Sequence, residues 1–271
     1  MNDYRSFYTF RVNKKKESYI QQRFINEYKF TEICQKYEIS GIFADYLRSL
    51  INYKVVIIAD DSGSMNTFTN YGEPRWNELC RFISTVFSVT EMIENSPLDV
   101  YFLNRPSIIN VQQLNQIAEA FNFPPKGATP IVPVLRHVLS EQYDPSYVGR
   151  IIIICTDGEP TDENNNRNIK QLYNVLMCQR KRNDFVSFLA CTDDDDSIAY
   201  LNRWDVEIPR VDVIDDDYPN EKKEVQRAQG RNFSFTFGEY VVKTLLGSVI
   251  PSLDKLDEYG IDVDCKFCSM M

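Results

Sequence analysis

The chain has 271 residues, of which 39 are acidic and 30 are basic, so its formal net charge is -9. Acidic chains repel the phosphates of nucleic acids and anionic lipids, and we expect neither as a partner. Hydrophobic residues make up 43% of the chain, enough for the core of one large α/β domain.

Residues 1–16 lack the apolar segment of a secretory signal, and no apolar run approaches the roughly 18 residues that cross a bilayer. The seven cysteines are odd in number, and several lie within apolar segments. That pattern is typical of reduced thiols rather than of a disulfide framework. We therefore expect a cytoplasmic protein.

In chain order, an N-terminal extension over 1–50 is expected first, with one or two helices over 31–50. After it, apolar runs of strand length alternate with segments of helical periodicity. The expected strands cover 54–59, 99–103, 107–111, 151–155, 185–190 and 211–214. The expected helices cover 76–87, 111–121, 129–139, 169–176, 198–204 and 240–256. This alternation predicts an α/β fold, a doubly wound, mostly parallel six-stranded sheet with helices on both faces.

Local signals place some of these elements. Ile151–Cys155 is the most apolar strand, so we expect it at the centre of the sheet. The strand over 107–111 is expected to pair antiparallel with 99–103 at an edge. Thr129 is expected to cap the helix that follows it, with Pro130 in the first helical position.

Three polar loops flank these elements. Asp60–Ser64 follows the first strand and reads Asp-Asp-Ser-Gly-Ser, and Gly127–Pro130 leads into a helix. Thr156–Pro160 follows the central strand and reads Thr-Asp-Gly-Glu-Pro. Ligands of open α/β sheets bind beyond the carboxyl ends of the strands, so we expect the three loops to meet at one rim.

This arrangement resembles the metal-ion-dependent adhesion site of von Willebrand factor A domains: Asp-x-Ser-x-Ser, a distant Thr, then Thr-Asp-Gly-x-Pro. The matching positions are Asp60, Ser62, Ser64, Thr129 and Asp157. The resemblance covers about residues 52–250. It implies a Rossmann-like von Willebrand factor A domain over 51–258, followed by a C-terminal tail over 259–271.

The residue types indicate the ion. Oxygen ligands without His or Cys select hard cations, so we expect Mg²⁺, or else Mn²⁺ or Ca²⁺. The resemblance implies that the Ser and Thr oxygens bind directly and that the aspartates often act through water. Neutral hydroxyls leave the ion seeking an anion, and we expect a protein partner to supply an Asp or Glu carboxylate. Gly63 and Gly158 are expected to allow tight turns near the ion.

Other interpretations stay open. Ser and Asp after strands commonly cap helices and do nothing else. A metal-dependent hydrolase or phosphotransferase could use the same ion, but no clear general base supports it, so we expect no enzyme. A scaffold that binds through other surfaces is the third possibility. His137, the single histidine, is expected on a helix surface or half-buried, and Cys155 in the core.

The end of the chain carries a separate signal. Cys268–Met271 fits the C-a-a-X form of a prenylation site, and Cys265 could carry a second lipid. The acidic residues just before them argue against it, so membrane contact is expected only if Cys268 is lipidated. The acidic runs over 193–196 and 215–217 are expected to be solvated loops.

Overall fold

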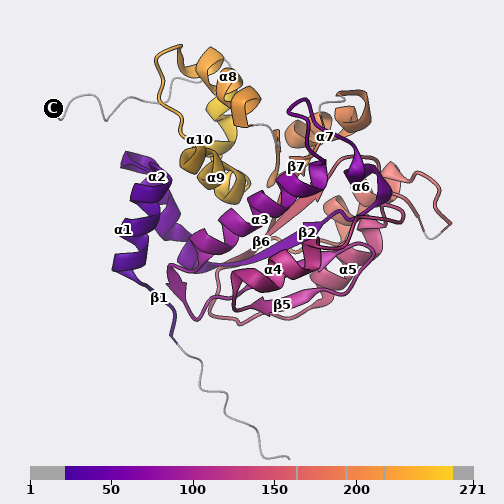
Figure 1. Ribbon diagram of the computed structural model, residues 1–271, viewed down its shortest axis with the longest axis horizontal. Helices are drawn as coiled ribbons and strands as arrows, with labels where there is room; N and C mark the ends of the chain where they lie inside the picture. Colours follow the sequence, from indigo (N-terminus) through magenta and orange to yellow (C-terminus); the bar gives the residue numbers. More distant parts are fainter. Residues whose placement is uncertain (1–21, 163, 193–194, 216–217, 259–271) are drawn as a thin grey trace, which may run out of the picture.

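The computed structural model describes residues 22–258, except 163, 193–194 and 216–217. Its centre is a six-stranded mixed sheet in the order β5-β4-β2-β6-β7-β8, in which the β4–β5 pair is antiparallel and the other neighbours are parallel (Figure 1). The strands are β2 (Tyr53–Ala59), β4 (Leu98–Phe102), β5 (Ile108–Val111), β6 (Gly149–Thr156), β7 (Asp184–Ala190) and β8 (Val211–Asp215). The α/β class, the antiparallel edge pair and the central place of β6 confirm the expectations from the sequence.

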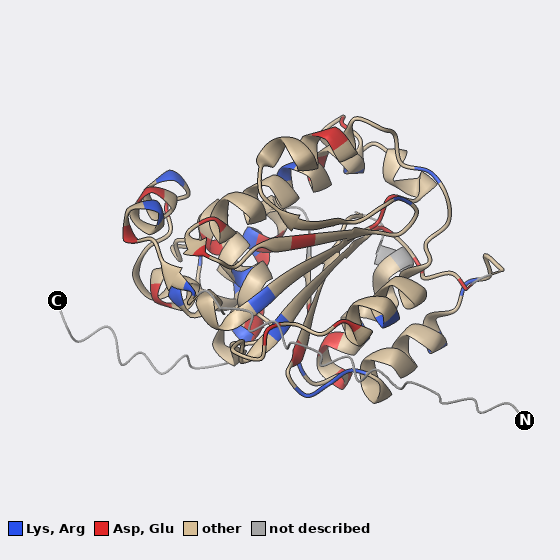
Figure 2. Cartoon of the chain, turned by 90° about the horizontal axis from the view of Figure 1, so that it is seen from below, with Lys and Arg blue, Asp and Glu red and all other residues tan. Residues whose placement is uncertain are grey.

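Side chains alternate along β2 between two cores. Val55, Ile57 and Ala59 belong to one core, and Val56 and Ile58 belong to the other. The sheet is therefore covered on both faces, which explains the uninterrupted apolar runs (Figures 1 and 2). The first core is covered by α1 (Glu27–Lys36), α2 (Gly41–Arg48), α3 (Arg75–Thr90), α4 (Leu114–Phe121), α8 (Tyr218–Gln229), α9 (Phe237–Leu246) and α10 (Pro251–Asp254). The second is covered by α5 (Ile131–Ser140), α6 (Ile169–Cys178) and α7 (Asp195–Glu207).

The segment before β2 packs against the main sheet. It forms α1, α2 and the 3-10 turn η1 (Ser49–Asn52), which confirms the helices expected over 31–50. Its first strand, β1 (Phe24–Ile25), pairs antiparallel with β3 (Ile93–Glu94). The Phe43 ring lies 6.1 Å from that of Phe235, so α2 is joined to the same core as α9.

The C-terminal helices differ from the prediction. The single helix expected over 240–256 is wrong: α9 ends at Leu246, α10 begins at Pro251, and the 3-10 turn η3 (Lys255–Asp257) follows. Proline cannot continue a helix, because it lacks the N–H and clashes with the preceding turn. Helix α8 was not expected, since it is polar and buries only Glu221 and Val225.

Two loop predictions are also corrected. Helix α5 begins at Ile131, Pro130 precedes it, and no side-chain cap hydrogen bond is made, so Thr129 is not its N-cap. Residues 195–196 lie in α7 and residue 215 ends β8, so the acidic runs are not entirely loop. In the described ranges, no helix has the length and hydropathy needed to cross a bilayer.

Candidate metal centre

Asp60 stands directly after β2 and is fully buried. Its Oδ1 accepts the Ser62 N–H at 2.8 Å, and its Oδ2 accepts the Thr156 hydroxyl at 2.7 Å. The carboxylate is thus fixed by its own loop and by the last residue of β6. Burial, and next the charge of Asp157, raise the pKa of Asp60 to about 7.

A chain of oxygen atoms links the first loop to the third. The Ser62 and Ser64 hydroxyl oxygens are 3.0 Å apart, and the Ser64 hydroxyl donates to Asp157 Oδ1 at 2.7 Å. Neighbouring ligands of an octahedral Mg²⁺, with bonds of about 2.0–2.1 Å, lie about 2.9 Å apart. The oxygen spacing and the donor set therefore fit a hard divalent cation.

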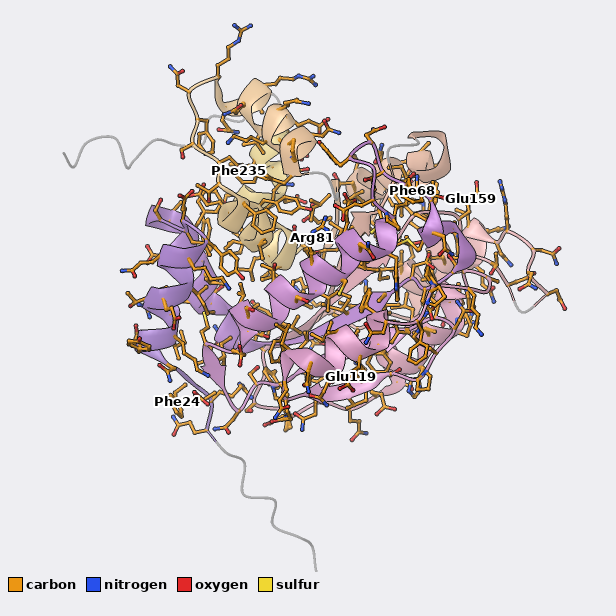
Figure 3. The ribbon with its side chains drawn as sticks, in the orientation of Figure 1. Phe24, Phe68, Arg81, Glu119, Glu159 and Phe235 are labelled. Carbon is orange, nitrogen blue, oxygen red and sulfur yellow. The ribbon has the colours of Figure 1, made fainter. Side chains whose placement is uncertain are left out.

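The second loop is tied to both of the others. The Gly63 N–H donates to the Gly127 carbonyl at 3.1 Å. The Thr129 N–H donates to the Thr161 hydroxyl at 3.1 Å, and the Thr161 N–H donates to the Thr129 carbonyl at 2.9 Å. The predicted meeting of the three loops is confirmed, and Figure 3 shows the side chains of the protein, with Phe68 just after the first loop and Glu159 within the third labelled.

The glycine that this rim requires is Gly127. Its φ is +111°, and an added Cβ would lie 2.4 Å from Asn104 Oδ1. Gly63 and Gly158, which were expected to make the tight turns, do not have positive φ. A Cβ on Gly158 would meet nothing within 4 Å, so the expectation for these two glycines is wrong.

Asp61 holds the first loop in place. It is buried, its Oδ2 accepts from Arg105 Nε at 2.6 Å, and its Oδ1 accepts the Asn104 N–H at 2.7 Å. The Arg105 guanidinium also donates to the Ala120 carbonyl at 2.7 Å and lies over the Trp76 ring, 4.7 Å from its centroid. This role was not predicted from the sequence. Its signal was the second acid of the Asp60-Asp61 pair, together with Asn104-Arg105 shortly after the end of β4.

Arg75, at the start of α3, is a second residue of the site that the sequence does not predict. Its guanidinium donates to Asp157 Oδ2 at 2.9 Å and to the Thr192 hydroxyl at 2.7 Å. Its sequence context, after Pro74, carries no signal for a site.

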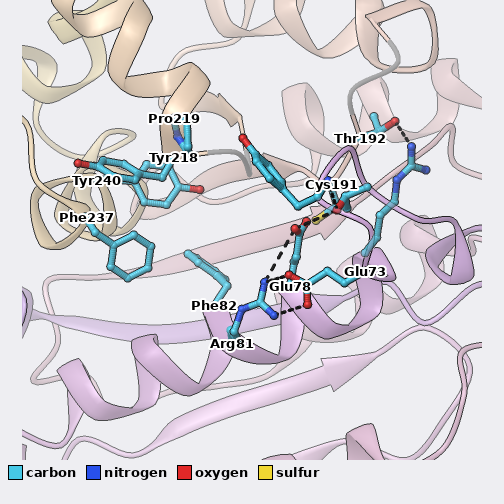
Figure 4. Close-up of a pocket in the computed structure, with 13 residues that line it drawn as sticks. Glu73, Glu78, Arg81, Phe82, Cys191, Thr192, Tyr218, Pro219, Phe237 and Tyr240 are labelled. Carbon is cyan, nitrogen blue, oxygen red and sulfur yellow. Dashed lines mark hydrogen bonds and ion pairs between the residues drawn. The ribbon is translucent and has the colours of Figure 1, made fainter.

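Arg75 and Thr192 also line a cavity of about 300 Å³ between α3 and the starts of α8 and α9 (Figure 4). Its wall combines aromatic rings with the exposed ion pair of Glu73 and Arg81. The aromatic residues are Tyr71, Phe82, Tyr218, Phe237 and Tyr240. A partly apolar cavity therefore lies next to the candidate metal centre.

The other residues that the sequence singled out lie as expected or beyond the described ranges. His137 has a side chain 59% exposed and is 3.7 Å from Glu141. Cys155 is fully buried in the first core. The C-a-a-X segment with Cys265 and Cys268 lies outside the described residues.

Comparisons with known proteins add little. No protein-family model matches the chain, and no curated protein matches it. Among solved structures, it is similar to a single-site mutant of the PilB minor pilin from Streptococcus sanguinis, with 16% identity and a TM-score of 0.46. The match covers 78% of this chain and 64% of the pilin, so the chain spans less than two thirds of that protein. At this TM-score, the likeness carries no argument about the site.

Proposed function

We propose that residues 51–258 form a doubly wound, Rossmann-like von Willebrand factor A domain that binds a protein partner through a divalent cation. The observation that supports it most is the linkage of Ser62, Ser64 and Asp157 through oxygen contacts of 3.0 and 2.7 Å. These residues come from two loops far apart in sequence. Helix capping alone does not require such a meeting.

The proposed ligands divide by chemistry. Ser62, Ser64 and Thr129 contribute neutral hydroxyl oxygens that bind Mg²⁺, or else Mn²⁺ or Ca²⁺, directly. Asp60 and Asp157 act directly or through water. A bound ion supplies a position that attracts the Asp or Glu carboxylate of the partner.

The local charges favour an anionic partner. Asp60 and Asp157 are two carboxylates, and Arg75 neutralises part of this charge through its 2.9 Å ion pair with Asp157. Asp61 is neutralised separately by Arg105. When Asp60 is ionised, as it is when it binds a cation, one net negative charge remains, so a divalent cation turns the centre positive. Partial burial strengthens its attraction for a carboxylate, because water screens it less.

We propose binding rather than catalysis, because the carboxylates of the centre are committed to other groups. Asp60 accepts from Ser62 and Thr156, Asp157 accepts from Ser64 and Arg75, and Asp61 is paired with Arg105. None is placed as a free general base. A metal-dependent hydrolase or phosphotransferase remains the alternative, and a screen with phosphate esters tests it.

The deciding experiment is affinity capture by the full chain in Mg²⁺ and in excess chelator, read by mass spectrometry. We expect partners that appear in Mg²⁺ and are lost both in chelator and with the Asp60→Ala, Ser62→Ala double variant. Thr31→Ala is the control, because within the described part of the chain the Thr31 hydroxyl bonds only the Glu27 carbonyl of its own helix. Partners captured equally well in chelator would favour the scaffold interpretation.

A further inference from the structure

A second group of carboxylates lies around the edge strand β8. Asp205 of α7, Asp212 of β8 and Asp254 of α10 each place one carboxylate oxygen within 4.8 Å of the other two. The three residues come from three separate elements, and none belongs to the loops of the candidate metal centre. The fold itself therefore brings three carboxyl groups together, and burial raises the pKa of each.

Asp212 is the buried member of this group. It is 1% exposed, and its Oδ2 has no hydrogen-bond partner. The carboxylate lies against Gly247, where an added Cβ would be 1.8 Å from Asp212 Oδ2. A buried carboxylate oxygen without a partner is strongly unfavourable unless a cation or a donor reaches it.

One buried cation, Lys243, is shared among many carboxyl groups. Its charge acts on Asp205, Asp212 and Asp254, but its ammonium contacts Glu221 at 2.9 Å and Asp257 at 3.2 Å. Lys255 follows Asp254 and is exposed to solvent, where its charge is screened. Asp205 accepts the Val213 N–H at 3.1 Å, a single hydrogen bond for a charged group. The described cations thus do not balance the carboxylates.

We propose that Asp205, Asp212 and Asp254 bind a second hard divalent cation, of the size of Ca²⁺, which joins α7, β8 and α10. Oxygens on opposite sides of Ca²⁺, at bonds of about 2.3–2.6 Å, lie about 4.6–5.2 Å apart. The observed limit of 4.8 Å leaves room for this ion. Asp205 and Asp254 are only partly buried, so water can complete the coordination. The ion acts on stability and is independent of the partner-binding centre.

The test is a Ca²⁺ titration of the full chain by calorimetry and thermal unfolding. The Asp60→Ala, Ser62→Ala double variant serves as background, because it removes the other candidate centre. In it we expect one remaining Ca²⁺ site and a higher unfolding temperature with Ca²⁺. Adding Asp212→Asn should weaken this binding at least tenfold and abolish the shift. Asp45→Asn, an exposed carboxylate on α2, should change neither.

The same variants separate the possible outcomes. Asp212→Asn keeps the side-chain shape and removes a buried ionisable group, so in chelator we expect it to be at least as stable as its background. If it does not fold, Asp254→Asn tests the site from its more exposed side. No Ca²⁺ binding in the background, or binding unchanged by both substitutions, would overturn the proposal. Neither result bears on the Asp60 centre, which the intact chain and the Mg²⁺ capture test separately.

Discussion

The candidate metal centre and the carboxylate group at β8 handle buried charge in different ways. At the centre, Asp157 is paired with Arg75 and Asp61 with Arg105. Around β8, Lys243 is shared by Glu221 and Asp257, and an oxygen of Asp212 has no hydrogen-bond partner. Protein contacts hold the first region together, so we expect the proposed cation there to add binding. In the second, a cation would add stability.

The largest effect is expected from Lys243→Met. This change leaves Glu221 buried without its cation, and breaking a buried pair typically costs about 3–5 kcal/mol. Urea denaturation measures the loss as a fall in the free energy of unfolding. The double variant Lys243→Met, Glu221→Met should recover much of it, because apolar side chains replace the pair. A fully stable Lys243→Met would show that Lys243 does not balance these carboxylates. The two regions would then not differ in the way that they handle buried charge.

The next effect is expected from Asp61→Ala at the candidate metal centre. It leaves Arg105, whose side chain is 15% exposed, without its carboxylate, and we expect a loss of about 2–3 kcal/mol. The control is Glu73→Ala, which breaks the exposed pair with Arg81 and should lose about 1 kcal/mol or less. Equal losses in urea denaturation would mean that the Asp61 pair does not organise the first loop.

The sequence predicted the parts of the fold that depend on local pattern. The strands are continuous apolar runs because the sheet is buried on both faces. Their alternation with helices predicts a mostly parallel sheet. Helix α8 escaped prediction because it buries little, and the break between α9 and α10 was missed although Pro251 marks it. Thr129 was taken for a cap because Thr before Pro is a common helix start.

The candidate site was predictable where residues follow strands, and not where they meet across the fold. Ser62, Ser64 and Asp157 follow β2 and β6, whose carboxyl ends must lie at one rim. The Arg75–Asp157 contact spans 82 positions, and no pattern in one sequence indicates it. Asp212 stands within a short strand and its partners in the group come from two helices, so the sequence treats it as an isolated charge.

A smaller effect should follow Gly127→Ala. The left-handed φ and the close approach of Asn104 make alanine unfavourable there by about 1–3 kcal/mol. The strain falls on the loop that carries Thr129, so we expect Mg²⁺ affinity to drop about tenfold, measured by calorimetry. Gly158→Ala is the matched control, because its Cβ meets open space and its φ is not positive. Similar effects of both substitutions would show that the backbone conformation of Gly127 is not needed for Mg²⁺ binding.

The smallest effect on stability, under about 0.5 kcal/mol, is expected from Thr129→Ala. The loop is held by the backbone of Thr129, through its contacts with Thr161, and α5 begins without a side-chain cap. Losing the hydroxyl should therefore leave unfolding in urea nearly unchanged. Mg²⁺ binding and capture of an acidic partner should both weaken, since the hydroxyl is a proposed ligand.

This separation of binding from stability is what distinguishes a ligand from a structural residue. If Thr129→Ala lowers stability by as much as it weakens Mg²⁺ binding, the hydroxyl supports the loop instead. If it changes neither, the ion does not use Thr129, and the centre is reduced to the first and third loops. Thr31→Ala removes the same atoms from an exposed position, so it shows how much stability and Mg²⁺ affinity vary for a substitution away from the site. Only a drop in Mg²⁺ affinity at constant unfolding free energy agrees with a centre that the protein assembles before the ion arrives.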